Sequence, residues 1–279
     1  MSPPTVHTTA GSAPGLPMTA LKAAAPPVQT ARCAGVFTLT LGRVPVNALD
    51  DALVDAIEAA VEAACDDPEI SVLHLRSACR VFCAGADLAL MRQSIATPQG
   101  LEQMLELVVR LQRVAARLES APLVTLAEIG GAALGGGFEL ALACDLRMAA
   151  HEARVGLPEA GLGLLAAAGG TQRLTRLVGP GLAKRLILGA ETVDGATAER
   201  LGLVQWALPR AELADAARVL AERIAAMPRH AMAAAKQCIA AAQDSARDGF
   251  AEELAHTRQL YQHPATRARV AAFLAHGAP

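Results

Sequence analysis

Ala133-Leu134-Gly135-Gly136-Gly137-Phe138-Glu139-Leu140-Ala141 is the most informative segment of the chain. Its three glycines precede a predicted apolar helix over 138–144, and they leave backbone N–H groups free beside the positive end of that helix. Such a turn can bind an anion or stabilise a developing oxyanion, although most glycine runs are only tight turns. A phosphate-binding P-loop is excluded, because no Lys-Ser/Thr pair follows the glycines.

Two carboxylates stand among apolar residues. Glu139 falls in the first turn of the helix after the glycines, and Glu159 follows Pro158 in a segment of small and apolar residues. Burying a charge is costly unless the charge is paired or used. Apolar surroundings can push two carboxyl pKa values apart, which suits an acid and a base in one reaction. The alternative is that each glutamate caps a helix N-terminus, where the dipole favours a negative charge.

Strands and helices alternate along the chain on both sides of the glycines. Alternating β-branched residues predict a strand over 36–41, and apolar residues spaced by three or four predict a helix capped by Asp50 or Asp51. Further strands are predicted over 70–75, 123–129, 146–149 and 155–157, and further helices near Met91, over 101–118 and over 169–178.

The pattern divides the chain into three parts. Residues 1–30 are rich in proline and predict a disordered tail, and residues 31–210 alternate as in an α/β core. From Ala211 onward the pattern is helical, so residues 211–279 are predicted to form a C-terminal helical region.

Composition limits the classes of function. The chain has 279 residues, of which 53% are hydrophobic, and a formal net charge of −2. This balance supplies a core and argues against a protein built to bind nucleic acid. No apolar run approaches the roughly 18 residues of a membrane span. The six cysteines show no CxxC or metal-ligand spacing, which predicts reduced thiols in a cytoplasmic protein and no metal site.

The main alternative from another class is a dinucleotide-binding oxidoreductase. Residues 161–166 match the weak pattern GxGxxA. The acidic residue that should follow about 20 positions later is missing, since Glu191 is the first acid after Glu159. No serine or histidine motif supports a triad hydrolase or a metalloprotease. These classes are therefore disfavoured.

Four segments, taken together, resemble the crotonase family, also called the enoyl-CoA hydratase/isomerase superfamily. The resemblance covers about residues 33–279 and implies a spiral of repeated strand–strand–helix (β-β-α) units with a C-terminal helical part. It also implies a homotrimer, or a homohexamer made of two trimers, assembled through the C-terminal helices. The segments, whose order and spacing fit the family, are 42–49 (Gly-Arg-Val-Pro-Val-Asn-Ala-Leu), 82–88 (Phe-Cys-Ala-Gly-Ala-Asp-Leu), 133–141, and Leu157-Pro158-Glu159 running on to Gly169-Gly170-Thr171-Gln172-Arg173-Leu174.

The resemblance implies a reaction and roles for residues. Family members bind acyl-CoA thioesters, and by motif position the backbone N–H groups of Ala86 and Gly136 should hold the enolate oxygen. Hydratases of the family have two glutamates at the positions of Glu139 and Glu159. The expected reaction adds water across a trans-2-enoyl-CoA: one carboxylate deprotonates the water that attacks C3, and the other glutamate, Glu159 by analogy, protonates C2. No metal or redox cofactor is implied, because coenzyme A is the carrier of the substrate.

The resemblance also implies contacts with the substrate. We expect an acyl pocket near Leu88, Met91 and Leu162, and a backbone N–H of Ala167 near the water. The whole expected set of substrate-binding residues is Arg43, Ala84, Asp87, Leu88, Met91, Gly135, Leu162 and Ala167.

The chain departs from the family pattern where coenzyme A is bound. Ala89 stands where many hydratases have a lysine, and His276 lies near the place of a C-terminal lysine that helps to hold the phosphates. Arg43, or arginines such as Arg267 and Arg269, are candidates to replace them. The alternatives left open are isomerisation or thioester hydrolysis, a non-catalytic subunit that binds coenzyme A, and an RNA-binding member, which the charge balance disfavours.

Overall fold

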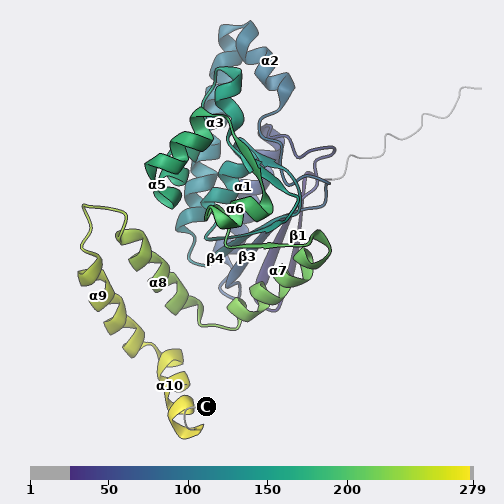
Figure 1. Ribbon diagram of the computed structural model, residues 1–279. Helices are drawn as coiled ribbons and strands as arrows, with labels where there is room; N and C mark the ends of the chain where they lie inside the picture. Colours follow the sequence, from purple (N-terminus) through teal and green to yellow (C-terminus); the bar gives the residue numbers. More distant parts are fainter. Residues whose placement is uncertain (1–25, 277–279) are drawn as a thin grey trace, which may run out of the picture.

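The computed structural model describes residues 26–276 (Figure 1), and most of the tail predicted over 1–30 lies outside them. The last residues of that range are not tail. Strand β1 (Val28–Cys33) pairs antiparallel with β2 (Val36–Leu41), with Val28 opposite Leu41. The core therefore begins at Val28 and not at residue 31, because Ala34 and Gly35 form a tight turn with positive φ angles of 48° and 77°.

The described strands form two sheets. The large sheet has the order β1-β2-β3-β4-β6-β9, and all its pairs beyond β1·β2 are parallel. The small sheet has the order β5-β7-β8. The remaining strands are β3 (Val72–Ser77), β4 (Val124–Ile129), β5 (Ala133–Leu134), β6 (Leu146–Ala150), β7 (Arg154–Gly156), β8 (Thr192–Asp194) and β9 (Trp206–Leu208).

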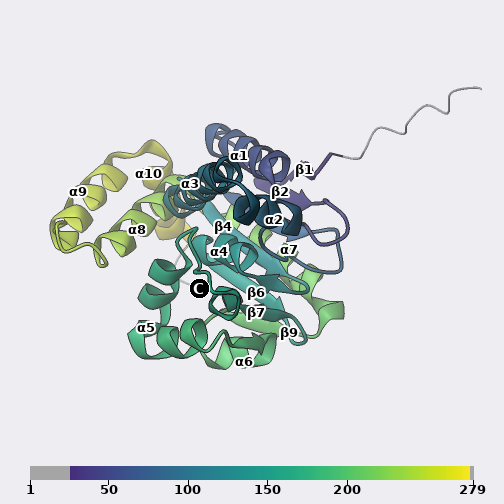
Figure 2. The same cartoon turned by 90° about the horizontal axis from the view of Figure 1, so that it is seen from above.

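Helices connect the strands and cover the sheets (Figure 2). Helix α1 begins after Asp50, whose Oδ1 accepts a hydrogen bond from the Leu53 N–H at 2.9 Å, so the first of the two expected caps is used. The helices are α1 (Asp51–Asp66), α2 (Leu88–Ala96), α3 (Pro98–Ser120), α4 (Gly136–Ala143), the 3₁₀-helix η1 (Pro158–Leu162), α5 (Gly170–Leu188), α6 (Gly195–Arg200), α7 (Arg210–Ala225), α8 (Arg229–Ala241), α9 (Gly249–Gln262) and α10 (Pro264–His276).

The expected strand–strand–helix unit repeats along the chain. Strand β4 of the large sheet is followed by β5 of the small sheet and then by α4. Strand β6 is likewise followed by β7, η1 and α5. After β3, a single bridge between Cys83 and Ala133 takes the place of the small-sheet strand, and α2 follows. In each repeat, the chain therefore passes from the end of a strand to the start of the next helix.

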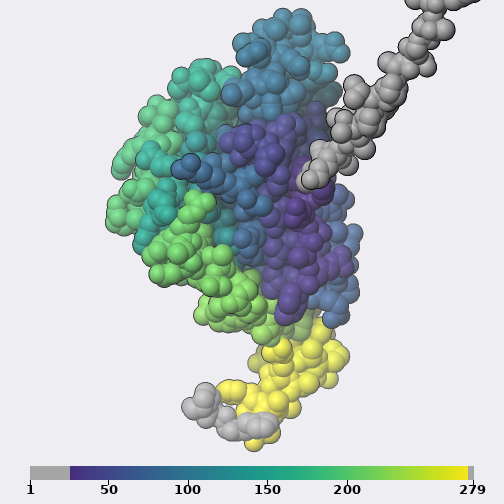
Figure 3. All heavy atoms as spheres, turned by 90° about the vertical axis from the view of Figure 1, so that its right-hand side faces the viewer, coloured from purple at the N-terminus to yellow at the C-terminus, as the bar shows by residue number. Residues whose placement is uncertain are grey.

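The C-terminal helices fall into two groups. Helix α7 packs on the large sheet through Leu213, Leu220 and Ile224, which are buried, so it belongs to the body of the molecule. The separate helical region therefore starts with α8 and not at residue 211, because α7 carries an apolar stripe that covers the sheet. Helices α9 and α10 extend away from the body (Figures 1 and 3). Within residues 26–276, no helix has the length and apolar character needed to cross a membrane.

Candidate active site

The first candidate donor of the oxyanion hole lies between β3 and α2, where residues 82–87 run beside residues 46–49. Leu49 donates its N–H to the Gly85 carbonyl at 2.8 Å and accepts the Asp87 N–H at 3.0 Å. In a parallel bridge of this kind, the N–H of the residue in between, Ala86, points away from Leu49. Segment 132–136 lies on that opposite side.

The second candidate donor is Gly136, the first residue of α4, whose N–H has no partner four residues earlier in the helix. The two segments touch, because a Cβ on Gly85 would lie 2.9 Å from the Leu134 carbonyl and 3.5 Å from the Gly136 nitrogen. Gly85 and Gly135 have φ angles of 91° and 52°, which favour glycine. The structure thus places Gly136 against Gly85, the residue before Ala86.

Glu139 lies one turn into α4, and its side chain is buried, with 3% exposed. Its Oε1 accepts the Gly170 N–H at 2.7 Å, at the start of α5. Burial raises the pKa of Glu139 to about 7, with a further contribution from the charge of Glu159, while the N–H groups of Gly170 and Ala168 oppose the shift. The carboxylate does meet a helix N-terminus, but that of α5, and the raised pKa distinguishes it from a simple cap.

Glu159 lies in η1 and faces the same glycine turn. Its Oε1 would be 2.7 Å from a Cβ at Gly135, so the turn and the carboxylate are in close approach. Burial raises the pKa of this carboxyl as well. Its Oε2 is buried and has no hydrogen-bond partner among residues 26–276. An unsatisfied buried carboxylate oxygen is costly, which is typical of a position that meets a water or a ligand.

The four groups therefore lie around the glycine turn over 135–137: two candidate main-chain N–H donors and two carboxyls with raised pKa values. A family model described as enoyl-CoA hydratase/isomerase matches residues 31–278. The chain belongs to the enoyl-CoA hydratase/isomerase family.

Similar sequences and solved structures support this family and its fold. The bovine (Bos taurus) mitochondrial enoyl-CoA hydratase domain-containing protein 2 is 44% identical over 183 residues, which are 64% of this chain and 60% of that protein. The 2,3-dehydroadipyl-CoA hydratase of Escherichia coli K12 is 39% identical over 228 residues, covering 81% of this chain and 85% of that protein. An enoyl-CoA hydratase structure from Bacillus anthracis is 31% identical, covers 91% of this chain and 98% of that chain, and has a TM-score of 0.84. The predicted crotonase fold is confirmed.

Arg43 and Asp87, both expected to bind substrate in this family member, form an ion pair. Arg43 Nη2 lies 2.7 Å from Asp50 Oδ2 and 3.1 Å from Asp87 Oδ2. Asp87 also caps α2 by accepting the Ala89 N–H at 2.8 Å, and this bond and Arg43 lower its pKa. The Arg43 charge is thus used within the chain to join the start of α2 to the start of α1.

The residues expected to contact the acyl group lie mostly at the surface. Leu88 and Leu162 are 78% and 70% exposed, so neither is core, and Met91 is partly buried on α2. Ala84 is exposed, and its N–H donates a hydrogen bond to the Val46 carbonyl at 3.0 Å.

Side chains of α3 and α5 donate hydrogen bonds to the loop between η1 and α5. Gln112 on α3 donates to the Ala167 carbonyl at 2.6 Å, and Arg173 donates to the Ala168 carbonyl at 3.1 Å. Sequence reasoning did not assign roles to Gly170 and Ala168, whose N–H groups meet Glu139. The Gly169-Gly170 pair was a usable signal, since a Cβ on Gly170 would lie 2.8 Å from Glu139 Oε1.

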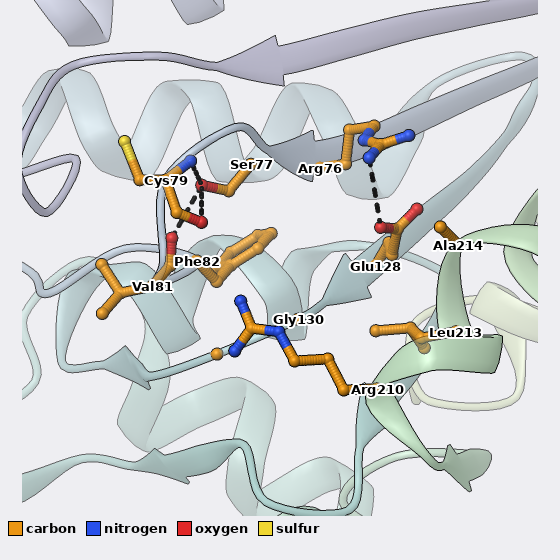
Figure 4. A pocket seen from close by; sticks show the side chains of 11 residues that line it. Arg76, Ser77, Cys79, Val81, Phe82, Glu128, Gly130, Arg210, Leu213 and Ala214 are labelled. Carbon is orange, nitrogen blue, oxygen red and sulfur yellow. Dashed lines mark hydrogen bonds and ion pairs between the residues drawn. The ribbon is translucent and has the colours of Figure 1, made fainter.

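A separate cavity of about 180 Å³ lies under α7 and is lined in part by segments 77–82 and 130–131 (Figure 4). Polar groups at its wall include Arg76, Glu128 and Arg210. None of the predicted site residues lines it. The disfavoured GxGxxA segment, residues 161–166, ends η1 and continues as an irregular loop, so it lacks the strand–turn–helix setting of a dinucleotide site.

Proposed function

We propose that the protein is an enoyl-CoA hydratase, which adds water across the double bond of a trans-2-enoyl-CoA. The observation that carries this proposal is the pairing of Glu139 and Glu159, two carboxyls of raised pKa, beside the candidate donors Ala86 and Gly136. An enzyme that only stabilised an enolate would have no use for two such carboxyls. Hydration needs both a base for the water and an acid for C2.

The reaction begins when the thioester oxygen accepts the N–H groups of Ala86 and Gly136. Glu139, as the carboxylate, takes a proton from water while the water oxygen bonds to C3. The C2–C3 π electrons move to the C1–C2 bond, and the carbonyl π electrons move to the oxygen, which gives an enolate. Glu159, as the neutral acid, then donates its proton to C2. The product is a 3-hydroxyacyl-CoA, and proton exchange with water returns both carboxyls to their starting states.

This chemistry uses groups of the chain and the coenzyme A carried by the substrate. The oxyanion donors belong to the main chain, and removing one such donor typically costs roughly 10²–10³ in rate. The uncharged exposed residues Leu88 and Leu162 would contact the acyl group. We propose no further cofactor and no metal ion.

The test is the loss of the conjugated enoyl absorbance when the protein meets crotonyl-CoA. We expect rapid loss for the wild type and a fall of roughly 10²–10⁴-fold in kcat for Glu159→Gln. Folded protein that binds coenzyme A but leaves crotonyl-CoA and longer enoyl-CoAs unchanged would refute hydration. A shifted double bond without incorporation of ¹⁸O from labelled water would instead assign an isomerase.

We further propose that the chain assembles as a homotrimer or as two such trimers. Helix α9 exposes Phe250, Leu254 and Tyr261, which are 83%, 73% and 70% exposed. Contiguous exposed apolar side chains favour a protein interface. Light scattering should give three or six times the 28.7 kDa of the chain, and the double variant Phe250→Asp, Leu254→Asp should give a smaller particle. A monomeric wild type would contradict the proposal.

A further inference from the structure

Asn47 is a fully buried polar residue that the proposed chemistry does not use. Its side chain has 0% exposure, and its φ of 49° lies in the left-handed region, which Asn tolerates better than most residues. A buried amide is retained at low cost only when each of its polar atoms has a partner. The partners of Asn47 therefore indicate what the residue does.

The Asn47 amide joins its own segment to the end of β3 and the loop that follows it, about 30 positions later in the sequence. Its Nδ2 donates to Ser77 Oγ at 2.8 Å, at the end of β3, and to the Phe82 carbonyl at 2.8 Å. Its Oδ1 lies 3.6 Å from Cys79 Sγ. Its main-chain carbonyl accepts the Cys83 thiol at 3.0 Å, and its N–H donates to the Arg43 carbonyl at 2.7 Å. Both amide protons and both carbonyl-type oxygens are thus used.

Ser77 extends this network across the loop that follows β3. The hydroxyl donates to the Val81 carbonyl at 2.7 Å and accepts the Cys79 N–H at 2.9 Å, as Figure 4 shows at one wall of the cavity. Because Asn47 donates to the same hydroxyl, the loop over 77–81 and the start of segment 82–87 have one common anchor.

Segment 82–87 carries the anchor to the candidate oxyanion donors. Phe82 and Cys83 both donate their N–H to the Ala132 carbonyl, at 2.9 and 3.0 Å, and Cys83 accepts the Leu134 N–H at 3.0 Å. Position 82 therefore sets the register of segment 82–87 against segment 132–134. Ala86 lies at the end of the first segment, and Gly136 follows the second.

We propose that Asn47 is a positioning residue that fixes the register of these two segments and so aims the N–H groups of Ala86 and Gly136 at one thioester oxygen. Asn47 touches no reacting atom and acts through its side-chain bonds to the Phe82 carbonyl and to Ser77. The inference rests on the proposed oxyanion hole. An error of about 1 Å in such geometry can cost roughly 10² in rate, which is why a residue outside the site can control the rate.

The first variant is Asn47→Asp, which keeps the shape and tolerates the positive φ but replaces both donated protons by acceptor lone pairs. The second is Ser77→Ala, which removes one acceptor and leaves the bond to Phe82. The matched control is Thr125→Ala. Thr125 is also 0% exposed, and its hydroxyl is hydrogen-bonded to Asp145 at 2.9 Å. It lies near the start of β4, whereas β5 and the glycine turn follow the end of that strand.

The readout is the absorption of bound 4-(dimethylamino)cinnamoyl-CoA, which moves to longer wavelength when hydrogen bonds polarise its thioester carbonyl. We expect the wild type and Thr125→Ala to show this shift. Asn47→Asp should lose most of it, with a fall in kcat for crotonyl-CoA of roughly 10–100-fold and a KM within a few-fold. Ser77→Ala should show a partial loss of the shift and a fall of roughly tenfold.

The outcomes separate this inference from the proposed function. A wild type that shifts the chromophore, together with folded Asn47→Asp and Ser77→Ala proteins that keep the full shift and the full kcat, would overturn the positioning role and leave the hydratase proposal intact. A wild type that binds the chromophore without a shift would refute the oxyanion hole itself. If Asn47→Asp does not fold, Ser77→Ala decides between the two.

Discussion

The molecule buries carboxylates in two different ways, and the contrast between Glu128 and Glu139 compares a carboxylate beside other side chains with the carboxylate that we propose to react. Glu128 on β4 is 6% exposed, with Oε2 2.9 Å from His74 Nε2 and Oε1 3.7 Å from Arg76 Nη2. Glu139 is 3% exposed, but it meets main-chain N–H groups and the charge of Glu159. The side chains of His74 and Arg76 lie beside the first carboxylate, whereas the second has a raised pKa, which suits proton transfer.

The largest expected effect is on the rate. Glu139→Gln should lower kcat for crotonyl-CoA by roughly 10²–10⁴-fold, because the amide accepts the Gly170 N–H but cannot take a proton from water. Glu128→Gln removes an equally buried carboxylate and should leave kcat within a few-fold, measured in the same assay. Comparable losses in both variants would mean that burial, and not chemistry, makes Glu139 important.

The next expected effect is on stability, with opposite signs for the two variants. The pKa of Glu139 is about 7 in the folded state against 4.5 for the ordinary carboxyl. Between about pH 4.5 and 7, the folded protein therefore holds a proton on Glu139 that the unfolded chain has lost. Above that range, the buried negative charge of Glu139 lowers the free energy of unfolding by about 3 kcal/mol. Glu139→Gln should therefore raise the free energy of unfolding at pH 8 and not at pH 4.5.

Glu128→Gln should instead lower the free energy of unfolding by about 1–3 kcal/mol, because it leaves His74 and Arg76 without their carboxylate. Urea unfolding at pH 8 and at the lowest pH that both variants tolerate measures the two changes. If both variants were destabilised at pH 8, the assignment of Glu139 as a strained carboxylate would be wrong.

The smallest expected effect is on the pH profile. If Glu139 works as the carboxylate, kcat/KM should fall up to tenfold per unit as the pH drops below about 7, because protonation removes the base. Glu128→Gln should keep this profile. A wild-type rate that stays constant between pH 5.5 and 7.5 would contradict the role of Glu139 as the base.

Local patterns predicted much of the fold. The strand over 36–41 has the predicted bounds, and the helix after Asp50 has the expected cap, because β-branched alternation and N-cap chemistry act within a few residues. Strands β5, β8 and β9 were not predicted. Each has two or three residues, and their pairing depends on partners far away in the chain.

The candidate site was predictable only in part. The glycine turn, Glu139 and Glu159 stood out because a charge in an apolar run is unusual. The hydrogen bond from the Gly170 N–H to Glu139 joins residues 31 positions apart, and the ion pair of Arg43 with Asp87 joins residues 44 positions apart. No local sequence pattern predicts such contacts, and the same holds for the ion pair of Arg43 with Asp50. The same applies to Asn47, which lies in a recognisable motif but whose partners are set by the tertiary structure.

The proposed use of main-chain atoms as oxyanion donors has a consequence for how such a protein can evolve. No side-chain replacement at Ala86 deletes its N–H, short of proline, whereas a single codon change at Glu139 or Glu159 rewrites the acid–base chemistry. The electrophile-activating part of the site is therefore buffered against mutation, and the proton-transferring part is exchangeable. Substitutions at those two positions can therefore change the reaction while the main-chain donors continue to bind the thioester oxygen.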